Sequence, residues 1–122
     1  MADKLLVVLA NADLAHPAEV LPPILQATVA AAMDYEVEVL FTGQAGHLAM
    51  VGVADAMVIE DEHHATVYEY IKQARKAGVQ FKVCTPAVKI WGDNIIPEIS
   101  ETVGAAYIIT ESMDSNVVTF TY

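Results

Sequence analysis

The sequence predicts an α/β fold: one domain spanning residues 1–122, in which a mostly parallel sheet of five or six strands is flanked by helices in a three-layer sandwich. Two observations predict it. Short runs of apolar and β-branched residues alternate with segments of helical length, as in repeated βαβ units. In addition, 55% of the residues are hydrophobic and only 18% are charged, which excludes a disordered chain.

The first half of the chain predicts three strands and two helices. Residues 4–10 are apolar and too few for a stable helix, which is typical of a strand covered on both faces. After a polar turn at 11–16, Pro17 suits a first helical turn. The Ala- and Leu-rich segment 22–33 predicts a helix that Pro22 and Pro23 must kink or restart. The remaining elements are a strand at 37–42, a turn into a small-residue helix at 43–52, and a short strand at 56–59.

The clearest helix begins after Thr66. Thr66 and Glu69 have capping-box spacing, apolar residues follow on one stripe, and Gly78 is placed to end the helix. The other predicted elements of this half are a fourth strand at 79–84, a turn or helix at 86–91, a helix at 95–103 ended by Gly104, and strands at 106–110 and 117–122.

Composition also bounds the function. Sixteen acidic and six basic residues give a net charge of −10, which opposes binding to nucleic acid or anionic lipid. The apolar stretches are far shorter than the roughly 20 residues of a membrane span, and residues 1–20 lack the basic start of a secretory signal. We therefore expect a cytoplasmic protein without membrane or nucleic-acid partners, and no motif calls for a metal or cofactor.

Cys84 is the main candidate for chemistry. It ends a predicted strand and precedes Thr85 and Pro86, which are typical of a helix start. The helix start, with Lys89 one turn later, would favour a reactive thiolate. The alternative is a small buried residue without chemistry. Because Cys84 is the only cysteine, a dithiol oxidoreductase is excluded, whereas a carrier that holds sulfur as a persulfide needs one thiol.

Other candidates lie in the predicted loops at the carboxyl ends of strands, where α/β sheets bind ligands. Asn11, Gly43 and His47 are candidate pocket residues, and Gly43 to Gly46 is a weak candidate for a phosphate-binding turn. His47 and His16 could act as acid or base, but a structural, hydrogen-bonded role is favoured for each. Trp91 could form a wall, although core packing is the commoner role of an isolated aromatic residue. His63 and His64 lie in the acidic segment 60–64, for which a solvated loop is favoured over a metal site.

The order of elements resembles the DsrE/DsrF/DsrH family of small sulfur-relay proteins, which includes the TusD-like subunits. The resemblance runs from Leu5 to about Ile109. It is carried by the opening L-L-V-V-L-A-N, by A-T-V-A-A-A-M-D-Y followed by V-E-V-L-F-T-G, and by A-G-V-Q-F-K-V-C-T-P-A-V-K-I-W-G with G-A-A-Y-I-I beyond. It implies a cysteine at the end of the fourth strand that accepts sulfane sulfur and passes it on, and the matching residue is Cys84.

The sequence therefore predicts a sulfur carrier or sulfurtransferase subunit, whose partners are donor and acceptor proteins with reactive cysteines. Two alternatives stay open: an assembly subunit of the same fold with an inert Cys84, and a small-ligand or nucleotide-binding module. A homo-oligomer is also expected. The resemblance implies trimers or hexamers, and the segments 20–33 and 44–54 carry no charged side chain, so a helix there needs cover on both sides.

Overall fold

A computed structural model describes residues 2–60 and 63–122. Its sheet has five strands, all parallel, in the order β4-β3-β2-β1-β5. All carboxyl ends therefore meet at one end of the sheet, as the alternation of elements predicted. The strands are β1 (Lys4–Leu9), β2 (Glu36–Phe41), β3 (Gln80–Cys84), β4 (Ile99–Val103) and β5 (Val117–Thr121).

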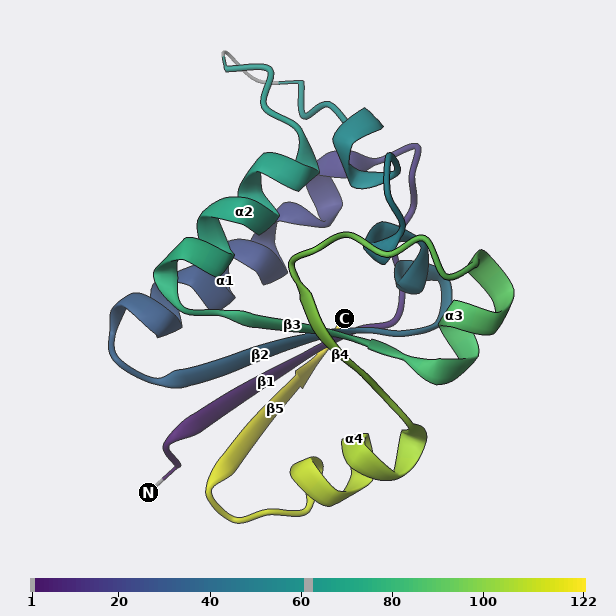
Figure 1. Cartoon of the computed structure of the whole chain (residues 1–122). Coiled ribbons are helices and arrows are strands. Elements are labelled where there is room, and N and C mark those ends of the chain that lie inside the picture. The colour runs from purple at the N-terminus through teal and green to yellow at the C-terminus, as the bar shows by residue number, and fades with distance from the viewer. Residues whose placement is uncertain (1, 61–62) are drawn as a thin grey trace.

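Helices cover both faces of the sheet, so the predicted three-layer α/β sandwich is confirmed. Figure 1 shows α1 and α2 on one face, α4 on the other, and α3 beside the carboxyl ends of the strands. The α-helices are α1 (Leu21–Ala32), α2 (Val67–Ala77), α3 (Thr85–Trp91) and α4 (Ala105–Ser112), and three short 3-10 helices are η1 (Pro17–Glu19), η2 (Gly43–Ala49) and η3 (Ala54–Ala56).

The larger core lies between the sheet and the α1–α2 layer. Strand residues alternate between the two faces, so Val7, Val39 and Phe41 face this layer, where the Phe41 and Phe81 rings stack at 5.7 Å. The opposite face has a smaller apolar cluster of Leu6, Val8, Leu40 and Val103, which Tyr107 and Ile108 of α4 cover. Both faces of the central strands are buried, which is why β1 after Lys4 is continuously apolar.

Three local predictions are confirmed at helix ends. Thr66 caps α2 with both capping-box hydrogen bonds, from Glu69 N to Thr66 Oγ1 (3.2 Å) and from Thr66 N to Glu69 Oε2 (2.9 Å). Gly78 ends α2 in the left-handed region at φ 114°. The proline pair restarts the helix, because Pro22 and Pro23 occupy the first turn of α1, after η1.

Three predicted elements are wrong. Residues 95–103 form no helix: Pro97 interrupts the segment, and Ile99–Val103 is edge strand β4. Residues 106–110 form no strand: they lie in α4, because a connection between parallel strands needs a crossover. Residues 56–59 add no strand to the sheet, and only Val58 makes an isolated bridge, with Thr66. Cys84 consequently ends the third strand in chain order, β3, and not a fourth strand.

The α4 face also holds a charged network, centred on a buried ion pair. Lys82 Nζ of β3 lies 2.7 Å from Glu38 Oε1 of β2, and the two residues are 7% and 3% exposed. The Tyr107 hydroxyl donates to Glu38 Oε2 (2.5 Å) and accepts from Lys82 Nζ (2.8 Å). Lys4 adds a contact to Glu38 (3.2 Å), and Glu101 adds one to Lys82 (3.1 Å). Each buried charge therefore has several partners.

Candidate functional site

The site is built around Cys84, where β3 passes into α3. Cys84 is both the last residue of the strand and the N-cap of the helix, and Pro86 lies in the first helical turn. The prediction that the thiol lies where a strand ends and a helix begins is confirmed. The side chain is only 3% exposed, so bulk solvent has little access to the sulfur.

Thr42 is the polar partner of the thiol. It follows β2, the neighbour of β3, and its Oγ1 lies 2.9 Å from Cys84 Sγ. Either atom can donate this hydrogen bond while the sulfur is a thiol. Once the sulfur is a thiolate, the hydroxyl must be the donor, and it then stabilises the anion.

Sequence reasoning missed Thr42, although a signal was present. Adjacent parallel strands that end at the same edge bring their last residues together, and Thr42 and Cys84 each follow the last pair in register between β2 and β3, Phe41 and Val83. A prediction of strand order would have been needed to use that signal.

Thr85 was expected to support the thiolate through its backbone amide and Lys89 through its ammonium, and the structure places the two residues differently. The Thr85 hydroxyl donates to Val103 O at 3.3 Å and so ties α3 to the end of β4. Lys89 is exposed in the last turn of the seven-residue α3, where it complements the carboxyl end of the helix. Of the groups proposed around Cys84, the backbone of Thr85 lies next to it, and Lys89 lies at the far end of the helix.

Gly43, His47 and Trp91 come together beside α3. Trp91 Nε1 donates to Gly43 O at 3.0 Å, and the Trp91 indole stacks on the His47 ring with centroids 4.3 Å apart. Gly46 allows η2 to approach this closely, because a Cβ there would lie 2.4 Å from the Ala87 Cβ. The structure thus joins three of the predicted pocket residues into one wall at the carboxyl end of the sheet.

The same geometry weighs against a phosphate-binding turn. In η2 the amide N–H of Ala45 donates to Ala10 O and that of Gly46 donates to Thr42 O. These two donors are committed to the fold and cannot bind an anion. Asn11 is exposed after β1. Its backbone N–H donates to Tyr122 O, so this donor is also used within the fold.

The remaining histidines lie in exposed segments. His16 is ion-paired with Asp13 at 2.7 Å, and this hydrogen bond raises the pKa of His16 above its ordinary value. His64 Nδ1 lies 3.9 Å from Glu60 Oε2, while Asp61 and Glu62 of the acidic segment lie outside the described residues. Within residues 2–60 and 63–122, no three His, Cys, Asp or Glu side chains are grouped to hold a metal ion.

Comparison with models of known protein families shows which family the chain belongs to. The model of the DsrE/DsrF-like family matches residues 4–112, which include β1 to β4, Thr42, Cys84 and α4. The chain belongs to the DsrE/DsrF-like family. This family is associated with sulfur relay, so the resemblance read from the sequence is confirmed at the level of the family.

Solved structures agree on the fold. This DsrE/DsrF-like chain is similar to a conserved protein of unknown function from Bacteroides thetaiotaomicron, with a TM-score of 0.66 and 13% identity over 98% of this chain and 95% of the other. At that identity the likeness shows the fold alone. No curated protein matches the sequence. In the part of the chain that the structure describes, no helix has both the length and the apolar character to cross a membrane.

Proposed function

We propose that this DsrE/DsrF-like protein is a sulfur carrier that holds sulfane sulfur as a persulfide on Cys84. The observation that supports it best is the position of Cys84 at the carboxyl end of β3, with the Thr42 hydroxyl 2.9 Å from its sulfur. Membership of a family associated with sulfur relay supports a role in sulfur transfer for a cysteine in that position. The partners proposed are donor and acceptor proteins with reactive cysteines.

The chemistry needs no redox cofactor. The Cys84 thiolate attacks the outer sulfur of a donor persulfide, a new S–S bond forms at Cys84, and the donor leaves as a thiolate. An acceptor thiolate then attacks the same outer sulfur, takes it as its own persulfide, and releases the Cys84 thiolate. Each step exchanges one S–S bond for another, so the number of electrons is conserved. Thr42 donates its hydroxyl proton in a hydrogen bond to the Cys84 sulfur whenever that sulfur bears charge.

The burial of Cys84 favours a second candidate, an assembly subunit with an inert thiol. A 3% exposed sulfur that already has a hydrogen-bonded partner satisfies the description of a structural cysteine. The two candidates differ in one property, the access of a sulfur donor to Cys84 in the folded protein.

Intact-mass measurement separates them. The native chain is incubated with a small-molecule persulfide donor, and the carrier function predicts an adduct of one sulfur atom that reducing agent removes and that Cys84→Ser lacks. Alkylation by iodoacetamide of the native and the urea-unfolded chain is measured in parallel. A native protein that neither loads sulfur nor reacts until it is unfolded would contradict the carrier function and favour the assembly subunit.

Thr42→Val tests the role of the hydroxyl. A hydrogen bond to a charged group contributes about 1.5–3 kcal/mol, so its loss should slow loading roughly tenfold or more. Thr85→Val is the matched control, since its hydroxyl bonds to Val103 O and its backbone amide is kept. Equal loading rates for Thr42→Val and wild type, with both folded, would remove Thr42 from the proposal.

A further inference from the structure

The two edges of the sheet differ in how they are protected from pairing with another strand. The β4 edge has a charged residue, Glu101, and a register shift opposite Phe81 and Lys82, two features that discourage a further strand. The β5 edge has neither: its register with β1 is continuous, and residues 117–122 include no charge and no proline. An edge of this kind is a template for another strand.

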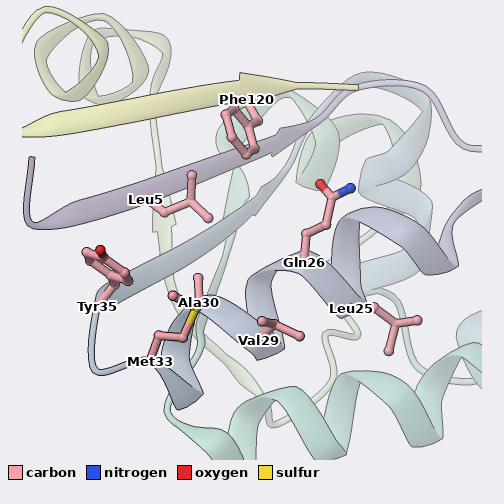
Figure 2. A pocket seen from close by; sticks show the side chains of 8 residues that line it. All are labelled: Leu5, Leu25, Gln26, Val29, Ala30, Met33, Tyr35 and Phe120. Carbon is pink, nitrogen blue, oxygen red and sulfur yellow. The ribbon is translucent and has the colours of Figure 1, made fainter.

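The face of β5 beside this edge is also apolar and uncovered. Helix α1 packs over β1 and β2, which leaves Val118 and Phe120 of β5 44% and 42% exposed. Phe120 and Leu5 of β1 line an open groove of about 350 Å³, with Val29 of α1, and also its neighbour of about 250 Å³, with Val118. Figure 2 shows Phe120 and Leu5 on the strands and Val29 on the helix across from them.

The backbone of β5 shows which groups face outward. Tyr122 N donates to Val8 O, and Tyr122 O accepts from Ala10 N, so Tyr122 is bonded toward β1. Because the direction alternates along a strand, Val118 and Phe120 are also bonded toward β1. The N–H and C=O groups of Thr119 and Thr121 and the C=O of Val117 therefore point away from the sheet, while the Val117 N–H donates to Asp114 O in the turn before β5.

We propose that β5 pairs antiparallel with β5 of a second copy of this chain, about a two-fold axis at Thr119. In this register Thr119 faces its own copy in a hydrogen-bonded pair, and Val117 pairs with Thr121 through one bond, from Thr121 N to Val117 O, because the Val117 N–H is bonded to Asp114 O. Val118 then lies opposite Phe120 of the other copy in the closer, non-hydrogen-bonded type of pair, and the aromatic and β-branched side chains contact across the strands. The strand is thus complementary to itself, and it joins two five-stranded sheets into one.

The self-complementary pairing of β5 and its lack of charge favour a second copy as the occupant. Each chain carries −10, so two copies repel, and the repulsion is least where the contact holds no carboxylates. The strand is uncharged, and among the residues that line the two grooves only Lys4 is charged. The contact is isologous, so it produces a dimer or an assembly with an even number of chains. It is independent of the chemistry at Cys84.

Sedimentation or light scattering of the full chain tests the interface. Wild type should have at least twice the chain mass of 13.1 kDa at micromolar concentration. Thr119→Pro removes an outward N–H and leaves the bonds to β1, and Phe120→Lys places a charge in the pair; each should halve the mass of the assembly. Ile109→Lys is the matched control, since Ile109 is 64% exposed on α4, and it should leave the mass unchanged.

Cross-linking gives a second measurement that does not depend on a disruptive variant. In a Cys84→Ser background, Thr119→Cys should form a disulfide-linked dimer under mild oxidation, because the two Cα atoms of a hydrogen-bonded pair lie about 5.5 Å apart. Ile109→Cys in the same background should not. A monomeric wild type, a three-chain assembly, or an assembly that both β5 variants leave intact without a Thr119 cross-link would overturn the proposal.

Discussion

Removing the ammonium of Lys82 should destabilise the fold strongly. In Lys82→Met, the Glu38 carboxylate stays 3% exposed and loses the partner at 2.7 Å. Deleting one member of a buried ion pair costs about 3–5 kcal/mol. Glu38 keeps the Tyr107 hydroxyl at 2.5 Å and Lys4 at 3.2 Å, so we expect the low end, about 3 kcal/mol. Urea unfolding measures it, as a fall in midpoint of roughly 2 M for a chain of this size.

The loss of stability in Lys82→Met should depend on pH. Burial raises the pKa of Glu38, but hydrogen bonds from Lys82, Tyr107 and Lys4 outweigh burial and hold it below the ordinary 4.5. Glu38 therefore contributes stability above pH 4.5 that is lost as the pH falls through its folded pKa. Without Lys82 the carboxyl takes up its proton more readily, so the difference between wild type and variant should narrow below about pH 4.5.

Two variants serve as controls. Glu101→Gln removes a contact to Lys82 of 3.1 Å from a side chain that is 56% exposed, and should cost about 0–1 kcal/mol. The double variant Glu38→Met with Lys82→Met removes both charges and should recover most of the stability. A loss below about 1 kcal/mol for Lys82→Met, or a loss that does not change with pH, would refute the reasoning.

Three other changes test local packing and capping, each by urea or thermal unfolding. Gly46→Val should cost more than 2 kcal/mol, because even the first added carbon lies 2.4 Å from the Ala87 Cβ; near-wild-type stability would show that η2 can move away from α3. Thr66→Ala should cost about 1 kcal/mol through the bond to Glu69 N, and an unchanged midpoint would contradict that role. Gly78→Ala should cost about 1 kcal/mol at φ 114°, whereas a gain would mean that the backbone relaxes.

The sequence predicted best where local chemistry alone decides the structure. The apolar run of β1, the capping box of α2 and the place of Cys84 at a strand end depend on residues close together in the chain. The errors at 95–103 and 106–110 have a different origin. Tyr107 and Ile108 are typical strand residues, yet they form a helix because β4 and β5 are parallel and need a crossover between them.

The charged network and Thr42 were missed for a related reason. Glu38 and Lys82 lie inside strands among apolar neighbours, and only their places in the sheet reveal that they pair. The same holds for Thr42 and Cys84, which are 42 residues apart in sequence and meet because β2 and β3 are neighbours. The type of a residue indicates which chemistry it can perform, but the order of the strands determines which residues it contacts.

Because Trp91 stacks on His47, tryptophan fluorescence reports on the carboxyl end of the sheet. The chain has one tryptophan, so all indole emission comes from the contact between α3 and η2, next to the end of β3. Circular dichroism instead reports on every helix, α1 and α2 most of all. If the emission changes at a lower urea concentration than the dichroism, the wall beside Cys84 opens before the rest of the molecule, and the free energy of that opening can be read directly from the two curves.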